Sequence, residues 1–172
     1  LCLGGIDARK GQLFLARVYR RMLADTPDLP SLIFVGPDRG HGPRLAAEVA
    51  ASPEPGKLEW RDYVSDAARE DLYQQAMLFL MPSTCEGFGL PLLEAMARGV
   101  PVIASDLPVL REIGGDAARF VVQGSQEAWA TGIRELVDDP AARAEWARRG
   151  SRQVEQFSWE WCARETLSCL TT

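Results

Sequence analysis

The sequence contains little histidine or cysteine, and neither is arranged as a metal site. One histidine and four scattered cysteines occur in 172 residues, and no two cysteines have CxxC spacing. Such a set does not predict a zinc site. We expect free thiols in a reducing compartment, and therefore a cytoplasmic protein.

Long apolar runs and an excess of basic residues are also absent. No apolar run reaches the ~18 residues that a membrane span needs, and the chain does not open with a secretory signal. The net charge is -5, with 24 acidic and 19 basic residues. This charge argues against nucleic acid as a partner. It still permits a local basic pocket for a small phosphate ligand.

What remains is the composition of one globular domain. Hydrophobic residues make up 47% of the chain and charged residues 25%, and 172 residues suffice for a single core. We therefore expect one domain over residues 1–172. The chain begins abruptly with Leu1, Cys2 and Leu3, which resemble a strand already under way. This start predicts a fragment of a longer protein.

Short apolar runs alternate with longer amphipathic stretches along the chain. The runs predict strands at residues 1–3, 31–35, 58–60, 76–81, 100–104 and 119–122. The stretches predict helices at 13–26, 43–51, 67–76, 91–97, 107–113, 126–137, 141–156 and 159–170. Residues 78–81 are apolar at every position, which is typical of a strand covered on both faces. The order predicts an α/β fold with a doubly wound, Rossmann-like parallel sheet of about six strands and helices on both faces.

The loop after the fourth predicted strand has the features of an anion site. Gly87 and Gly89 leave the backbone unobstructed, and Pro91 suits a first helical position. Free amides at a helix start favour a phosphate group. We expect Glu94 in the first turn of this helix, where the dipole keeps it ionised and its two oxygens suit a ribose diol. Glu86 would then lie on the other side of the phosphates.

The loop after the first predicted strand, residues 4–11, supplies positive charge at the same sheet edge. Glu86 and Glu94 alone would repel a diphosphate, so Lys10 and Arg9 are the candidates for its countercharge. Basic pairs at helix starts are also common on solvated surfaces. The loop lacks GxGxxG spacing, which argues against a nicotinamide dehydrogenase. The residues by themselves predict a phosphate-containing ligand.

Residues 86–94, continuing to residue 106, closely resemble the E-x7-E region of family 4 glycosyltransferases. Residues 33–37, 63–66, 113–118 and 157–159 resemble further landmarks, in the family order. The resemblance covers essentially the whole chain but only half of such an enzyme. It implies the C-terminal, donor-binding half of a retaining GT-B glycosyltransferase.

The resemblance also implies roles for individual residues. It implies that Glu86 contacts the donor sugar and assists catalysis, that Glu94 binds the ribose hydroxyls, and that Lys10 neutralises the diphosphate. Backbone groups would hold the rest of the donor. These belong to the first-loop Gly5, to Tyr63 and Val64 near the base, and to Gly87, Phe88, Gly89 and Leu90 at the diphosphate.

The first loop departs from the family pattern at one position. Many members carry an arginine directly after the first glycine, whereas Gly5 follows Gly4 here. The loop is nearer to the variant G-T-I-E-P-R-K, which favours GDP-mannose as the donor. Arg9 is the candidate for the second positive charge, and the alternative is that Arg9 pairs with Asp7 or with a neighbouring carboxylate.

By this resemblance the reaction is transfer of a hexose from a nucleoside-diphosphate sugar to a glycan or lipid-linked acceptor, without metal or cofactor. A missing N-terminal domain would bind the acceptor, so we expect the isolated chain to be inactive. Apolar residues such as Trp159, Trp161 and Leu167 either face that domain or pack on their own. The full-length protein would associate peripherally with the inner face of the membrane.

Two alternative functions stay open. One is a non-catalytic GT-B-like binding module, against which the presence of both Glu86 and Glu94 argues. The other is a different GT-B enzyme, such as a sugar-nucleotide epimerase or a phosphorylase.

Overall fold

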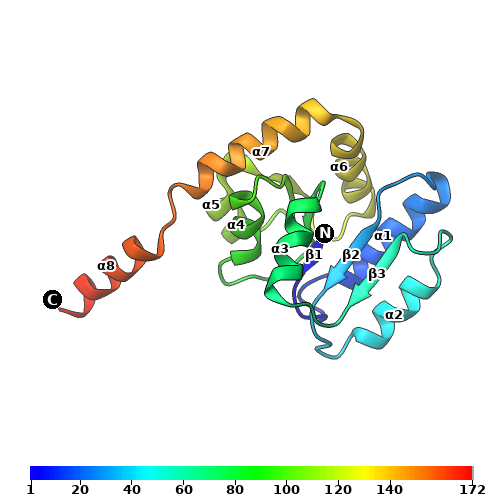
Figure 1. The fold of residues 1–172 in the computed structure, drawn as a ribbon, viewed down its shortest axis with the longest axis horizontal. Coiled ribbons are helices and arrows are strands. Elements are labelled where there is room, and N and C mark those ends of the chain that lie inside the picture. The colour runs from blue at the N-terminus through cyan, green and yellow to red at the C-terminus, as the bar shows by residue number, and fades with distance from the viewer. Residues whose placement is uncertain (172) are drawn as a thin grey trace.

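The computed structural model describes residues 1–171, in which strands and helices alternate (Figure 1). The strands are β1 Cys2–Leu3, β2 Leu32–Val35, β3 Leu58–Arg61, β4 Phe79–Met81, β5 Val102–Ser105 and β6 Arg119–Val121. The α-helices are α1 Gln12–Asp25, α2 Gly42–Ala50, α3 Asp66–Gln75, α4 Leu90–Ala97, α5 Pro108–Gly114, α6 Gln126–Asp138, α7 Pro140–Val154 and α8 Trp159–Leu170. Every predicted strand and helix is present, with small shifts at the ends.

The strands form two parallel three-stranded sheets, β1-β2-β3 and β4-β5-β6. The sheets adjoin at β1 and β4, where the amide of Leu80 donates to the carbonyl of Leu1 at 2.8 Å. The amino group of Leu1 donates in turn to the carbonyl of Leu78 at 2.9 Å. The spatial order is therefore β3-β2-β1-β4-β5-β6. Successive strands are added on one side of β1 up to β3 and on its other side from β4 onwards, so the order of strands reverses between β1 and β4. Ligands of doubly wound folds bind at such a reversal, outside the carboxyl ends of the strands.

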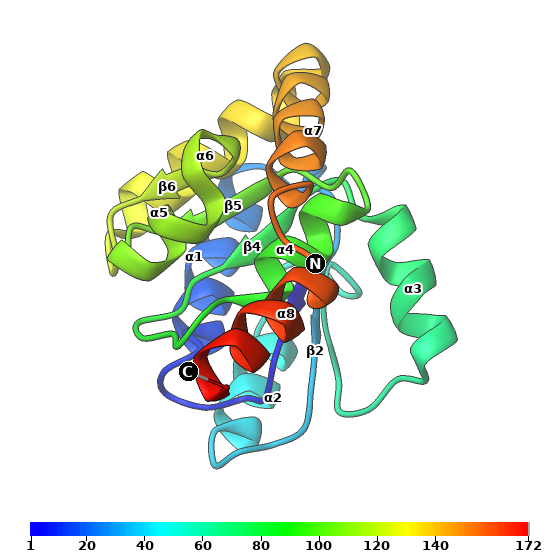
Figure 2. The ribbon, with the colours of Figure 1, turned by 90° about the vertical axis from the view of Figure 1, so that its left-hand side faces the viewer.

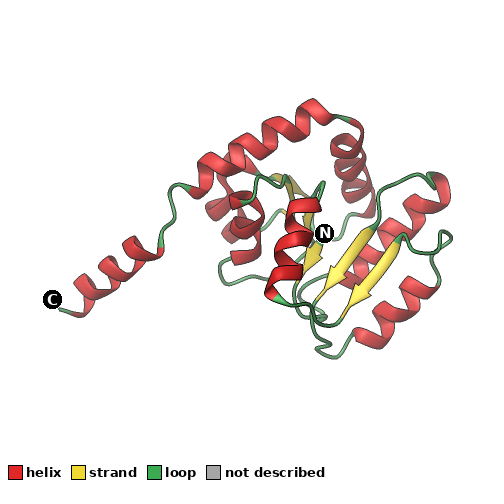
Figure 3. Ribbon diagram, in the orientation of Figure 1, coloured by secondary structure: helices red, strands yellow, loops and turns green. Residues whose placement is uncertain are grey.

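Helices cover both faces of the strands, as expected. Figure 2 shows α1 and α3 on opposite sides, and Figure 3 shows the strands between layers of helices. Side chains of the central strands alternate accordingly between two apolar clusters. Leu80 and Ile103 belong to the cluster beneath α1 and α6, whereas Phe79 and Val102 belong to the cluster beneath α4 and α5. This arrangement explains why the run at residues 78–81 has no polar face.

Helix α8 extends away from the rest of the molecule (Figure 1). It has no buried residue, and Trp159, Trp161 and Leu167 are 78%, 57% and 62% exposed. Of the two alternatives from the sequence, packing of these residues on their own domain is therefore wrong. Phe157, after α7, still packs on Phe88, and beyond it no α8 residue within residues 1–171 is buried against the domain. No helix within residues 1–171 is both long enough and apolar enough to cross a membrane.

Candidate functional site

Two loops meet where β1 and β4 end at their carboxyl sides. The amide of Thr84, in the loop after β4, donates to the carbonyl of Arg9, in the loop after β1, at 2.6 Å. Gly11 makes this approach possible, because a Cβ there would lie 2.1 Å from the carbonyl oxygen of Pro82. Gly11 also has a φ of +70°, which favours glycine. The two candidate loops therefore form one surface.

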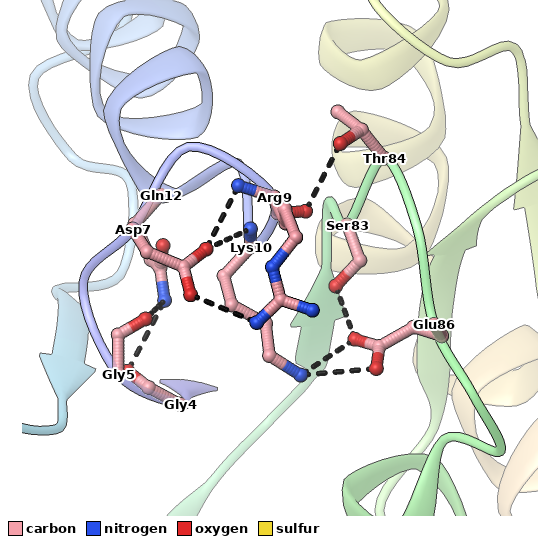
Figure 4. A network of polar contacts seen from close by, with 9 residues as sticks. All are labelled: Gly4, Gly5, Asp7, Arg9, Lys10, Gln12, Ser83, Thr84 and Glu86. Atoms are coloured by element: carbon pink, nitrogen blue, oxygen red, sulfur yellow. Dashed lines mark hydrogen bonds and ion pairs between the residues drawn. The ribbon is translucent and has the colours of Figure 1, made fainter. Parts of the chain in front are cut away.

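Lys10 and Glu86 form an ion pair across these loops (Figure 4). The Lys10 ammonium group donates to both carboxylate oxygens of Glu86, at 2.7 Å and 3.0 Å. The Glu86 side chain is only 9% exposed, and the buried hydroxyl of Ser83 donates to the same carboxylate at 2.6 Å. A carboxylate so enclosed needs such partners. An ammonium group has three N–H bonds, so one remains for a further acceptor.

Arg9 pairs with Asp7, and no hydrogen bond or ion pair joins its described side chain to Glu86 (Figure 4). Its guanidinium group lies 3.2 Å from the Asp7 carboxylate, and its side chain is 65% exposed. Asp7 also accepts the backbone amides of Arg9 at 2.8 Å and Lys10 at 3.0 Å. Partial burial alone would raise the pKa of Asp7, but these amides and the Arg9 charge outweigh burial and lower it. The sequence left open whether Arg9 supplies a free positive charge or pairs with a carboxylate. The structure shows the pair with Asp7.

Gln12 fixes the Gly4–Gly5 backbone and was not identified from the sequence. Its side chain is 1% exposed, and its amide nitrogen donates to the carbonyls of Gly4 at 3.1 Å and Gly5 at 3.0 Å. Gly36 packs closely on the same turn, since a Cβ there would lie 2.2 Å from the carbonyl oxygen of Gly4. In the sequence Gln12 is only a polar residue at a helix start, so no local signal distinguishes it.

The start of α4 presents unpaired amides beside the ion pair. Gly89 is the N-cap with a φ of +102°, and the amides of residues 87–90 donate no hydrogen bond within the described chain. Nothing lies within 4 Å of a Cβ placed on Gly87. Amides of this kind, at the positive end of a helix dipole, favour an anion. Phe88 packs edge-on against Phe157 with ring centroids 6.2 Å apart, which steadies the loop.

Glu94 does not lie in the first turn of α4, so that prediction is wrong. The helix begins at Leu90, one residue earlier than predicted, and Glu94 is its fifth residue. The dipole is therefore a weaker influence on Glu94 than we expected. Its carboxylate instead accepts the hydroxyl of Tyr73 at 2.9 Å. Tyr73 is fully buried, and burial together with the nearby Glu94 charge raises the pKa of its phenol.

Tyr63 and Val64 lie in the loop between β3 and α3, at the same sheet edge. Tyr63 is 84% exposed and Val64 is half-buried. No hydrogen bond within the described chain joins either residue to Lys10, Glu86 or Glu94. The structure thus pairs Lys10 with Glu86, and no hydrogen bond among residues 1–171 links the candidate base-binding segment to that pair.

Known proteins resemble both the sequence and the fold. Residues 1–153 match the family model described as glycosyl transferases group 1. The chain is 33% identical over 168 residues to O-antigen chain mannosyltransferase B of Escherichia coli, covering 98% of this chain and 44% of that protein. It is 31% identical over 163 residues to the phosphatidyl-myo-inositol mannosyltransferase of Mycolicibacterium smegmatis, covering 92% of this chain and 41% of that protein. The chain thus spans less than half the length of these two relatives.

A solved structure has the same fold over most of its length. It is the C-terminal domain of a glycosyl transferase group 1 family protein from Francisella tularensis, with a TM-score of 0.78 and 24% identity. The superposition covers 90% of this chain and 83% of that one. The fold is accordingly that of the C-terminal half of a GT-B glycosyltransferase. Family match and fold together show that this chain belongs to the group 1 glycosyltransferases.

Proposed function

We propose that this chain is the donor-binding half of a retaining glycosyltransferase, which moves a hexose from a nucleoside-diphosphate sugar to a glycan or lipid-linked acceptor. One observation carries the proposal: the Lys10 ammonium group is held against Glu86 beside the unpaired amides of residues 87–90. These groups would face a diphosphate that lies at the carboxyl edge of the sheet.

The diphosphate leaves with the electron pair when the bond from the anomeric carbon to the phosphate oxygen breaks. Negative charge on that oxygen grows in the transition state. Lys10 and the amides of residues 87–90 are fixed before substrate arrives, so they stabilise this charge without reorganising. The proposal therefore needs no metal ion to stabilise the leaving group.

The two glutamates have different surroundings and would take different parts of the donor. Glu86 is enclosed by Lys10 and Ser83 and would contact the sugar next to the diphosphate. Glu94 is anchored by Tyr73 through one carboxylate oxygen and would accept the ribose hydroxyls with the other. Tyr63 and Val64 would contribute backbone groups to the base.

GDP-mannose is the donor that we propose. The first loop favours it, and both of the relatives named above are mannosyltransferases by name. One of those names specifies an O-antigen chain and the other phosphatidyl-myo-inositol, so the acceptor class stays a glycan or a lipid-linked molecule. A second domain would bind this acceptor, with the exposed face of α8 turned towards it.

The test is nucleotide binding by the 172-residue chain, measured by thermal shift and calorimetry with GDP, UDP, ADP and dTDP. We expect GDP to raise the melting temperature most, because a ligand at 100 times its Kd stabilises the folded state by about 2.7 kcal/mol. Lys10→Ala and Glu94→Ala should each abolish most of this shift. Arg134→Ala, which removes an exposed charge on α6, is the matched control. Absence of binding to all four nucleotides would refute the proposal and favour a non-catalytic module.

A further inference from the structure

Two cationic side chains lie against the Gly4–Gly5 turn. The Cδ of Lys10 lies 3.6 Å from where a Cβ of Gly4 would be. The Cγ of Arg39 lies 2.8 Å from where a Cβ of Gly5 would be. The Arg39 side chain, from the loop after β2, therefore occupies space that any side chain at residue 5 would need.

The backbone of Arg39 is tied to the first loop. Its amide donates to the carbonyl of Ile6 at 3.1 Å, and the amide of Ile6 donates to the carbonyl of Pro37 at 2.8 Å. Ile6 and Asp38 form a parallel bridge. The position of Arg39 is thus coupled to the turn that it covers, although the two segments are far apart in sequence.

Arg39 is an exposed cation that makes no ion pair with any carboxylate of residues 1–171. The neighbouring Asp38 is occupied by the amides of Gly40 at 2.8 Å and Gly42 at 2.7 Å. Asp62 accepts the amide of Asp38 at 3.2 Å. Both carboxylates accept backbone amides, and among residues 1–171 neither forms an ion pair with Arg39, whose guanidinium group is therefore available to an anion.

Charge at the proposed diphosphate site is otherwise balanced. Glu86 compensates Lys10, and Asp7 compensates Arg9. A diphosphate carries more than one negative charge, so the balanced pairs alone do not match it. A guanidinium group binds two phosphate oxygens at once and keeps its charge at any working pH.

From this geometry we propose that Arg39, and not Arg9, is the second cation that binds the diphosphate of the donor. The inference rests on the proposed function, since it specifies a residue of the same site. It also assigns a role to the unusual Gly5, whose missing side chain leaves room for Arg39.

The test is calorimetry of GDP binding to the 172-residue chain and its variants, with UDP, ADP and dTDP in parallel. We expect Arg39→Ala to weaken GDP binding at least about 10-fold, which corresponds to 1.4 kcal/mol, and Arg39→Lys to weaken it less. Guanosine, which has no phosphate, should bind both variants as it binds the wild type. Arg134→Ala, with the same loss of charge, should change GDP affinity less than about twofold.

Failures of the two proposals are distinguishable. If the wild type binds none of the four nucleotides, both fall. If it binds GDP and Lys10→Ala weakens binding but Arg39→Ala does not, the proposed function stands and Arg39 is not the second cation. A larger loss from Arg9→Ala than from Arg39→Ala would also overturn the assignment. Circular dichroism of each unliganded variant shows whether it is folded.

Discussion

The ion pair of Lys10 and Glu86 fixes a flexible side chain in the absence of any ligand. A free lysine side chain loses up to ~2 kcal/mol of rotamer entropy when it is immobilised. Here that loss is already offset by two hydrogen bonds to Glu86, and Ser83 in turn fixes Glu86. The ammonium group is therefore preorganised for an anion, which raises affinity without adding contacts.

Asp7 gives the first loop a pH dependence. The pKa of its carboxyl is lowered in the folded protein, so it contributes stability above its unfolded pKa of about 3.9. That contribution is lost as the pH falls through the lowered folded pKa. We expect Asp7→Asn to reduce the free energy of unfolding at pH 5–7, and the difference from wild type to shrink towards pH 3.

Urea unfolding of wild type and Asp7→Asn at several pH values measures this effect. Asp25→Asn at the end of α1 is a control that removes a carboxylate outside the site. A wild-type advantage that stays constant from pH 7 to pH 3 would contradict the prediction.

At the scale of elements, the junction of the two loops depends on Gly11. Alanine there would place a Cβ 2.1 Å from the carbonyl oxygen of Pro82 at a φ of +70°. Gly99 has a nearly identical φ of +67° but nothing within 4 Å. We expect Gly99→Ala to cost about 1–2 kcal/mol of stability, the penalty of a left-handed conformation, and Gly11→Ala to cost more because its backbone contact must also break.

Chemical denaturation measures the loss of stability in each variant. Both variants carry the conformational penalty, so the difference between the two losses gives the cost of the clash at residue 11. Gly11→Ala should also lose GDP binding, whereas Gly99→Ala should retain it. Equal destabilisation by the two substitutions would show that the loops can separate without loss of stability.

The element pattern was predictable from the sequence because it depends on local regularities. Residues 78–81 are apolar on both faces, and Leu80 and Phe79 do face opposite clusters. Gly87 and Gly89 predicted a junction between a strand and a helix, and α4 does begin directly after Gly89. Periodicity and turn residues carry such information directly.

Partners within the site were less predictable because they come from distant segments. Lys10 was expected to face only a phosphate, but the described structure pairs it with Glu86, 76 residues away. Tyr73 was not singled out in the sequence, because nothing near it in sequence indicates Glu94 as its partner. Arg39 likewise lies in a loop without any phosphate-binding pattern. Such contacts follow from the positions of the strands and not from local residue types.

At the scale of the whole molecule, α8 is attached to the domain without contributing to its core. None of its residues is buried, whereas Phe157 just before it packs on Phe88. We expect truncation after Phe157 to change the melting temperature by less than about 2 °C, since a loss of 1 kcal/mol shifts a domain of this size by about 2–4 °C. Differential scanning calorimetry measures the shift.

A truncation after Asp139 provides the comparison, because it also removes α7. Gly150 of α7 packs against Met96, whose Cγ would lie 3.1 Å from a Cβ at residue 150. This shorter chain should unfold at a much lower temperature. If removal of α8 alone lowered the melting temperature by 5 °C or more, α8 would have to contact the domain in solution.

The ion pair of Lys10 and Glu86 also determines when the site can exist during folding. Its partners are 76 residues apart, and contacts between such distant residues form only after a large loop has closed. While a ribosome is still synthesising β4, Lys10 is already part of the chain, but its partner Glu86 has not yet been made. Recovery of nucleotide binding during refolding would therefore mark the joining of the two sheets, later than the formation of either one.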